Sequence, residues 1–216
     1  RLIWQSSAWR ELQPTVCYLS ERHRHKDDRF IRLLDEMRSG TVSAQMREVL
    51  QACRRPVAPG EVTKLYTHNA DVERINADAL ARLPGQPHRF RAHLKGNLAL
   101  AERLLQGSLV HEQLELKPGA KVMFIKNNFE CGFVNGTLGE VIGFDDDTGA
   151  PLVQKRDGGQ VIAYPEEWSV ANEAGRKLAS VEQTPLRLAW AITVHKSQGM
   201  TLDAAEVDLG KAFEAG

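Results

Sequence analysis

Two short apolar runs, residues 15–19 and 62–66, organise the first part of the chain, and we expect each to form a β-strand. A polar loop and then apolar residues at helical spacing follow each run. The expected helices begin at Asp27 or Asp28 and stop at Gly40, begin at Ser43, and begin at Asn69 or Asp71. This alternation of strand, loop and helix predicts a parallel α/β sheet.

The pattern changes near residue 115, where short apolar segments alternate with turn signals. Turns are expected at residues 117–119, 135–136, 145–149 and 157–159, which are rich in Gly, Asn, Asp or Pro. The segments between them, residues 120–126, 137–144, 152–154 and 160–164, are expected to be strands. Short strands at close spacing predict a small antiparallel β-barrel.

After Pro185 the chain returns to a longer apolar run at residues 186–191, which predicts one more strand of the α/β domain. Residues 193–199 are its polar exit, and residues 204–209 form a last expected strand. The pattern predicts an α/β domain that a small β-barrel interrupts. The expected domains are 1–115, the first part of the α/β domain, 116–185, the inserted barrel, and 186–216, the resumed α/β domain.

The composition is that of a globular protein, with 42% hydrophobic and 26% charged residues among 216. The 28 basic and 28 acidic residues give a formal net charge of zero. A globally basic chain is therefore excluded, and contact with a phosphate backbone would have to come from local patches.

The three cysteines, Cys17, Cys53 and Cys131, are scattered and form no C-x-x-C pair, so neither a disulfide framework nor a metal site is expected. A reducing cytoplasm is the expected compartment, with nucleoid association if the source is bacterial. No run approaches 18 consecutive apolar residues, so we expect no membrane partner. The start at Arg1 without methionine and the end at Gly216, soon after a strand, indicate part of a longer polypeptide.

Three polar exits follow the expected strands, at residues 20–26, 67–69 and 193–199. Ligands of open α/β sheets collect beyond the carboxyl ends of the strands, where helix starts offer backbone N–H groups to anions. Hydroxyl and imidazole groups can bond phosphate oxygens, Lys196 adds positive charge, and Gly199 allows close backbone approach. This chemistry suits phosphate; the alternative is a capped helix start with a surface lysine.

Other site classes find less support. The triplet His23-Arg24-His25 has no further ligands at metal-binding spacing, and no G-x-S-x-G motif accompanies Ser197 and His195. The pattern G-x-x-x-x-G-K-[ST] is absent from the sequence. A nucleotide could therefore contact this chain, but no motif here cradles its phosphates alone.

The stretch LRLAWAITVHKSQGMTLDAAEVDLG, residues 186–210, is similar to motif V of the Pif/RecD-like branch of superfamily one DNA helicases. Three further stretches share the resemblance. They are residues 1–38, with QSSAW and LSERHRHKDDRFIRLL, which resemble the motif IV segment; TKLYTHNADVERIN, 63–76, which resembles the next phosphate-contacting motif; and 116–144, which resemble the entry to an inserted SH3-like barrel. Residues 84–115 are the least distinctive.

The resemblance implies the second of two RecA-like domains, with its inserted SH3-like barrel. In that family the two domains sandwich ATP and Mg²⁺ and move along single-stranded DNA. The implied partners are single-stranded DNA and the N-terminal RecA-like domain, which carries Walker A and the acidic metal-holding motif. A later motif supplies an arginine finger. The fragment alone is expected to bind no cofactor and to hydrolyse no ATP.

The resemblance also implies roles for single residues. The implied DNA-binding residues are Thr67, His68, Asn69, Thr193, His195, Lys196 and Ser197, with Asn127, Asn135 and Gly136 on the barrel near the DNA path. Gln198, Gly199 and Thr201 would face the nucleotide, and Arg24 would be the catalytic arginine that reaches the γ-phosphate. The family has glutamine where His25 follows Arg24, which leaves Arg22 as an alternative. An ordinary hairpin turn is the alternative for Asn135-Gly136.

Three functions follow from these patterns. The first is the C-terminal portion of an ATP-dependent DNA helicase that moves 5′ to 3′. The second is a stand-alone module that binds single strands or proteins, although Arg24 and Gln198 would then have no purpose. The third is the alpha-type subunit of an exonuclease V-like complex, which would share the motifs and differ in partners.

Overall fold

The computed structural model describes residues 3–17, 27–54, 62–198 and 205–207. The chain divides into two compact units, Arg1–Pro56 and Val57–Gly216. Each unit is described below by itself.

The first unit is helical and follows its capping signals. A 3₁₀ turn at Ile3–Gln5 precedes α1 (Ser7–Leu12), α2 (Asp28–Ser39) and α3 (Ala44–Ala52). The Asp27 carboxylate accepts hydrogen bonds from two backbone N–H groups of α2, and Gly40 ends that helix with φ +75°. The Ser43 hydroxyl caps α3 by accepting from the Met46 N–H. Both helix predictions are confirmed.

The expected strand at residues 15–19 is not borne out where it can be followed. Thr15, Val16 and Cys17 have no regular secondary structure, and residues 18–19 lie outside the described residues. Propensity alone does not make a strand, because a strand needs a paired neighbour to satisfy its backbone groups.

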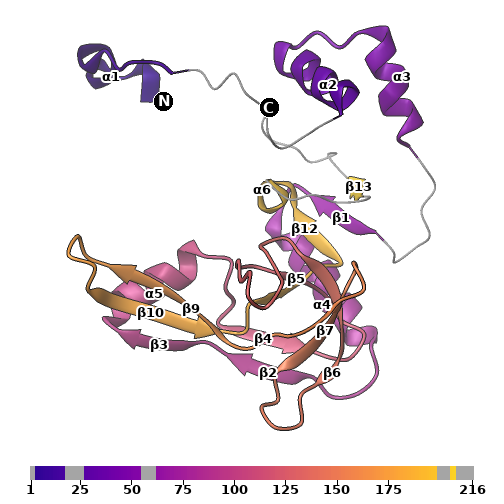
Figure 1. The fold of residues 1–216 in the computed structure, drawn as a ribbon, viewed down its shortest axis with the longest axis vertical. Helices are drawn as coiled ribbons and strands as arrows, with labels where there is room; N and C mark the ends of the chain where they lie inside the picture. The colour runs from indigo at the N-terminus through magenta and orange to yellow at the C-terminus, as the bar shows by residue number, and fades with distance from the viewer. Residues whose placement is uncertain (1–2, 18–26, 55–61, 199–204, 208–216) are drawn as a thin grey trace. The chain divides into compact units, whose positions relative to one another are not determined.

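The second unit contains the predicted parallel sheet, in the order β12-β1-β13. Its strands are β1 (Thr63–Tyr66), β12 (Ala191–Thr193) and β13 (Ala205–Val207), and both outer strands run parallel to β1. Helix α4 (Asn69–Arg82) follows β1 and packs against β12 and β1. Figure 1 shows the three strands side by side.

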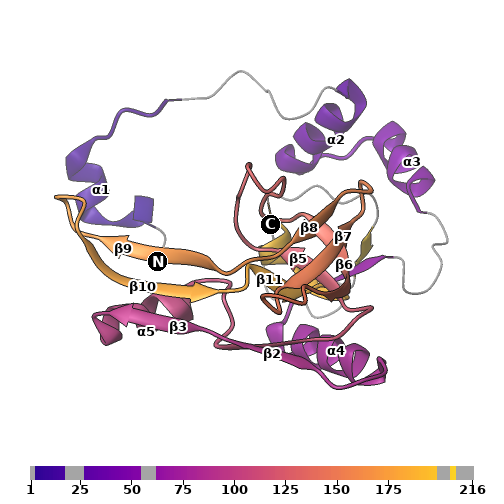
Figure 2. The same ribbon diagram turned by 60° about the horizontal axis from the view of Figure 1, so that its bottom comes forward.

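Ten further elements form the antiparallel part of this unit. A five-stranded sheet has the order β11 (Leu186–Leu188), β5 (Lys121–Phe124), β6 (Leu138–Phe144), β7 (Pro151–Lys155), β8 (Gln160–Ile162). A second sheet has the order β3 (His93–Gly96), β10 (Lys177–Gln183), β9 (Glu166–Ala171), and β2 (His88–Arg91) pairs with β4 (Gln113–Leu116). Helix α5 (Leu98–Gly107) packs on β3, β9 and β10 (Figure 2).

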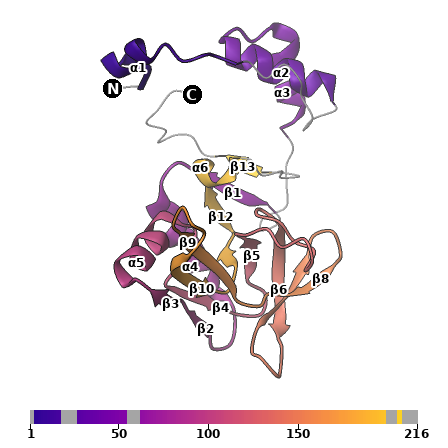
Figure 3. The ribbon, with the colours of Figure 1, turned by 60° about the vertical axis from the view of Figure 1, so that its left-hand side comes forward.

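These sheets confirm the mixed α/β class and qualify the barrel. The turn signals correctly predicted β5, β6, β7 and β8. Among the described residues, however, the strand pairings do not close into a ring, since β11 and β8 are the two ends of the five-stranded order. Figure 3 shows this sheet to one side of the β3-β10-β9 group.

The apolar run at residues 186–193 serves two sheets rather than one. Its first part, β11, pairs antiparallel with β5, and its second part, β12, pairs parallel with β1. The link between them is also bonded, because the Ala189 N–H donates to Lys121 O and the Lys64 N–H donates to Trp190 O. The prediction of a single strand at 186–191 is therefore wrong: the chain bends at Trp190 and changes partners there.

Strand β5 separates two hydrophobic clusters. Val122 and Phe124 belong to one cluster and Met123 and Ile125 to the other, because alternate residues of a strand point to opposite faces. All four are buried, which explains why this segment is continuously apolar.

Strand pairing also crosses the expected domain boundaries. The β3–β10 pairs join residues 93–96 to residues 179–182, and the β5–β11 pairs join residues 122–124 to residues 186–188. The division at 115/116 and 185/186 remains a prediction.

Candidate nucleic-acid interface

Two of the three predicted polar exits lie at one edge of the parallel sheet. Tyr66 is in register with Thr193, and both strands run in the same direction. The segments that follow them, Thr67 to Asn69 and Val194 to Ser197, therefore leave the sheet at the same edge. The third exit, residues 20–26, lies outside the described residues.

The exit after β12 forms a single helical turn, α6 (Val194–Ser197). Hydroxyl groups of Thr193 and Ser197 make hydrogen bonds to the backbone of this turn. The buried Thr193 Oγ1 accepts a hydrogen bond from the Lys196 N–H at 3.4 Å, which leaves its own proton available to a further acceptor. The Ser197 hydroxyl donates to Val194 O at 2.8 Å, so in this arrangement it can only accept. Thr193 is thus the better placed hydroxyl donor for a phosphate.

His195 and Lys196 are the other polar groups on this turn. The His195 side chain is exposed and that of Lys196 is half-buried. Burial lowers the pKa of Lys196, and the nearby Arg187 charge lowers it further. An ammonium that water solvates incompletely has more to gain from a bound anion than a fully hydrated one.

The exit after β1, residues 67–69, leads directly into α4. His68 is the N-cap residue and makes no side-chain capping hydrogen bond, and Asn69, the first helical residue, is exposed. The opening N–H groups of the helix therefore lie at the same sheet edge as α6 and can contribute to anion binding there.

Asn76 is a positioning residue that the sequence analysis did not identify. Its amide donates to Ala191 O at 2.9 Å and its carbonyl oxygen accepts from the Ala191 N–H at 2.9 Å. This buried pair ties α4 to the first residue of β12 and so fixes where α6 begins. A signal was present, because Asn76 is polar yet lies midway between Val72 and Leu80 on the apolar stripe of α4.

Asn127, Asn135 and Gly136 come together in the loop between β5 and β6. Asn127 Oδ1 accepts from the Asn135 N–H at 2.8 Å, and Gly136, with φ +95°, donates to Phe124 O at 2.8 Å. These contacts build the turn, as the alternative interpretation expected. Both asparagine side chains remain exposed, and their contact with DNA stays a prediction.

Only one residue of the nucleotide-facing set can be placed. Gln198 follows α6, its side chain is exposed, and its N–H donates to His195 O at 3.3 Å. Arg24, its alternative Arg22, Gly199 and Thr201 lie outside the described residues. Within the described part of the chain, no cluster of His, Cys, Asp or Glu could hold a metal ion, and no helix is long and apolar enough to cross a membrane.

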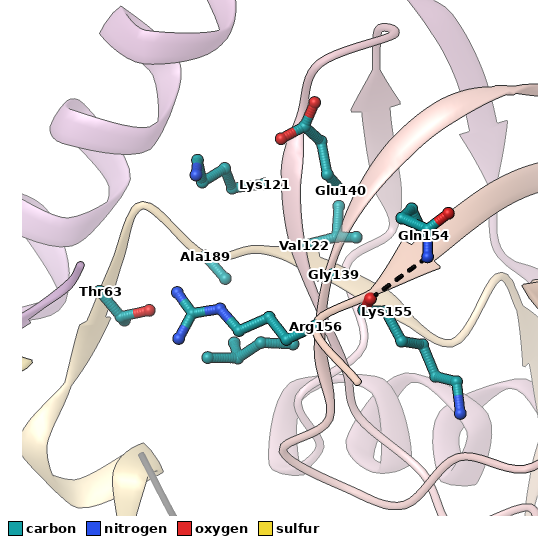
Figure 4. A pocket seen from close by; sticks show the side chains of 10 residues that line it. Thr63, Lys121, Val122, Gly139, Glu140, Gln154, Lys155, Arg156 and Ala189 are labelled. Atoms are coloured by element: carbon teal, nitrogen blue, oxygen red, sulfur yellow. Dashed lines mark hydrogen bonds between the residues drawn. The ribbon is translucent and has the colours of Figure 1, made fainter. Parts of the chain in front are cut away.

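A cavity of about 210 Å³ between the parallel and the five-stranded sheets lies away from this edge. Arg156 extends toward Thr63 and Ala189, whereas Lys155 points away from them (Figure 4). The Lys155 ammonium donates to Gly132 O at 2.9 Å and contacts Asp157 at 3.1 Å. Because Thr63 begins β1, this cavity lies at the amino end of that strand, opposite to the polar exits.

Comparison with known proteins finds similarity to Pif1 helicases. Residues 99–144 match the family model described as DNA helicase Pif1, 2B domain. The chain is 39% identical to the ATP-dependent DNA helicase Pif1 of Psychrobacter sp. (strain PRwf-1) and 38% identical to the human ATP-dependent DNA helicase PIF1. Both matches cover all of this chain, but only 41% and 34% of the relatives' length.

A solved structure supports the same relationship. The crystal structure of Bacteroides Pif1 bound to ssDNA superposes with a TM-score of 0.58 at 28% sequence identity, over 89% of this chain and 45% of that one. The matched part of the relatives is their C-terminal portion.

Proposed function

We propose that this chain, which is similar to Pif1 helicases over its full length, is the C-terminal portion of an ATP-dependent DNA helicase that moves along single-stranded DNA. The observation that carries the proposal is the meeting of two polar exits, residues 67–69 and 193–197, at one sheet edge through the register of Tyr66 with Thr193. By resemblance the direction of movement is 5′ to 3′.

In this proposal the sheet edge holds the phosphates of the strand. Thr193 and His195 donate hydrogen bonds, Lys196 supplies charge, and the start of α4 adds backbone N–H groups from residues near Asn69. Such contacts depend little on base sequence, because every nucleotide presents the same phosphate. The edge therefore suits a protein that moves along a strand.

The nucleotide would be shared between this chain and the N-terminal RecA-like domain. By resemblance, Arg24, Gln198, Gly199 and Thr201 would contact it from this side, while the other domain would supply Walker A and hold Mg²⁺. Closure around ATP would change the contacts with the strand, because ATP binds the closed arrangement better than the open one.

We propose that the parent protein is located in the cytoplasm.

The first test is a salt titration of a labelled oligothymidine against the 216-residue chain. We expect preference for the single strand over duplex, with an affinity that falls as salt rises. Lys196→Ala should reduce the slope of log K against log salt by about 0.7, the value for one phosphate on a single strand.

Lys95→Ala is the matched control, because Lys95 is an exposed lysine on β3 that already pairs with Glu182 at 2.7 Å. Its slope should match the parent chain. An equal loss in both variants would indicate diffuse attraction rather than a site, and no binding of oligothymidine at low salt would contradict the proposal.

A second measurement concerns ATP. The sequence contains no G-x-x-x-x-G-K-[ST] motif, so we propose that this chain alone does not turn over ATP, even with oligothymidine present. Turnover by pure chain that disappears in Gln198→Ala would overturn this part of the proposal.

A further inference from the structure

We infer that Arg187 and His111 form a second phosphate site, which holds a further backbone phosphate of the bound single strand. The site is a cavity of about 220 Å³ that α4, β4 and β11 enclose. The inference rests on the proposed function, because it extends the DNA track from the sheet edge toward this cavity.

Arg187 carries a half-buried charge that the protein satisfies only in part. It is the middle residue of β11, and one guanidinium nitrogen donates to Leu109 O at 3.3 Å. Among the described residues, no carboxylate lies within 4.0 Å of its guanidinium. A guanidinium has five N–H donors, and leaving a buried charge without a counterion is costly. The group is therefore prepared for an anion.

A neutral imidazole, His111, and a second cation, Lys196, accompany Arg187. Burial, together with the charges of Arg187 and Lys196, lowers the pKa of His111 to about 4. His111 is thus neutral at pH 7, where its imidazole can donate one hydrogen bond. Burial also lowers the pKa of Arg187 and of Lys196, and the Arg187 charge acts on Lys196 in addition.

Acidic groups near the cavity do not cancel this charge. Glu73 on α4 favours the charged forms of Arg187 and Lys196, but it is exposed and forms no ion pair with them within the described residues. Glu115 on β4 is already bound by Arg89 at 2.8 Å. Two cations on different elements, β11 and α6, therefore face one carboxylate at a distance, which leaves an excess of positive charge for an anion.

The cavity is also preorganised. The Gln183 amide donates to His111 O at 3.0 Å, and Asn76 fixes Ala191 at the start of β12, which leads directly into α6. The apolar walls are Val72, Leu80, Leu114 and Leu188. An apolar wall strengthens the attraction between a cation and a phosphate, and the planar guanidinium matches two phosphate oxygens at once. The charge of Lys196 on α6, which acts on His111, favours a strand phosphate over a free anion.

The test uses Arg187→Met, which keeps an apolar side chain of similar length and removes the charge. We expect weaker oligothymidine binding and a salt slope that is smaller by about 0.7. Arg187→Lys should retain part of the slope, because a lysine still supplies charge without the bidentate fork. Arg103→Met, which removes an exposed arginine from α5, is the control and should bind as the parent chain does.

A second readout follows the His111 pKa by NMR titration. Oligothymidine should raise this pKa, because a phosphate in the cavity favours the imidazolium form. Arg187→Met should raise it in the free protein and abolish the further rise on binding. A merely structural role for Arg187 would lower stability without coupling the His111 pKa to DNA.

The outcomes separate the two proposals. Suppose that the salt slope of oligothymidine binding falls in Lys196→Ala but not in Arg187→Met, and that DNA leaves the His111 pKa unchanged. The inference is then wrong and the proposed function stands. If inorganic phosphate moves the His111 pKa but oligothymidine does not, the cavity binds free anions and the inference again fails. If the parent chain binds no single strand, the proposed function itself fails.

Discussion

Residues 27–54 and residues 62–198 carry equally clear apolar patterns, yet they bury their apolar side chains to very different extents. Helices α2 and α3 bury only Leu33 and Met46, while Phe30, Leu34 and Met37 are 40%, 41% and 53% exposed. In β5, Val122, Met123 and Phe124 are at most 1% exposed.

The difference shows that the local signals that define a helix do not by themselves bury its apolar side chains. Caps at Asp27, Gly40 and Ser43 are enough to define the ends of two helices. Burial in β5 requires partners that are distant in sequence, such as β11. Because tertiary packing supplies most of a helix's stability, the stability of this chain should be concentrated in residues 62–198.

The sharpest way to break this comparison is to truncate one apolar side chain in each region. Phe124→Ala removes a fully buried ring that stacks on Phe133 with centroids 4.1 Å apart. We expect its free energy of unfolding in urea to fall by about 3–5 kcal/mol. Leu34→Ala in α2 should cost less than about 1 kcal/mol, because its side chain is 41% exposed. Similar losses in both variants would show that the comparison is false.

A smaller effect is expected where α4 meets β12. Asn76→Ala leaves the Ala191 N–H and C=O groups without their partner, and each unsatisfied buried group costs about 1–3 kcal/mol. We expect a loss of about 2–4 kcal/mol and faster amide hydrogen exchange at Ala191. The control is Asn172→Ala in an exposed turn, where the side chain accepts only from the Arg176 N–H. Unchanged exchange at Ala191 would show that Asn76 does not position β12.

The smallest effect is expected in residues 27–54, where local capping defines the helices. Ser43→Ala removes the N-cap of α3 and should cost about 1 kcal/mol of local helix stability. Circular dichroism should record a small loss of helix, while the unfolding midpoint of residues 62–198 stays the same. Ser39→Ala at the exposed end of α2 is the control. A shift of the main midpoint would mean that the two regions unfold together.

Elements with local signals could be predicted from the sequence. Helices α2, α3 and α4 begin at or beside the residues expected to start them, and strands β5 to β8 lie between the expected turns. The meeting of residues 67–69 and 193–197 also followed from the sequence, because parallel strands end at the same edge of a sheet.

Elements whose own residues give no clear pattern, and residues whose role depends on a distant partner, could not be predicted. Strand β9 reads Glu-Glu-Trp-Ser-Val-Ala, without clear alternation, and it forms because β10 pairs with it. Strand β10 in turn lies against Gly96, where a Cβ atom would stand 2.4 Å from Leu178 O. Arg187 looked like an ordinary polar residue inside an apolar strand, since its significance depends on a cavity that α4 and β4 complete.

The split run at residues 186–193 has a consequence for how the chain folds. Leu65 pairs with Ile192 although more than half of the chain lies between them, so this contact closes a very long loop and carries a large entropic cost. Intervening hairpins such as β6–β7 and β7–β8 close short loops and can form early. Once β11 has joined β5, the three residues of β12 need travel only a short way to reach β1. The proposed DNA-binding edge is thus assembled late, after faster-folding hairpins have reduced the entropic cost of bringing β12 to β1.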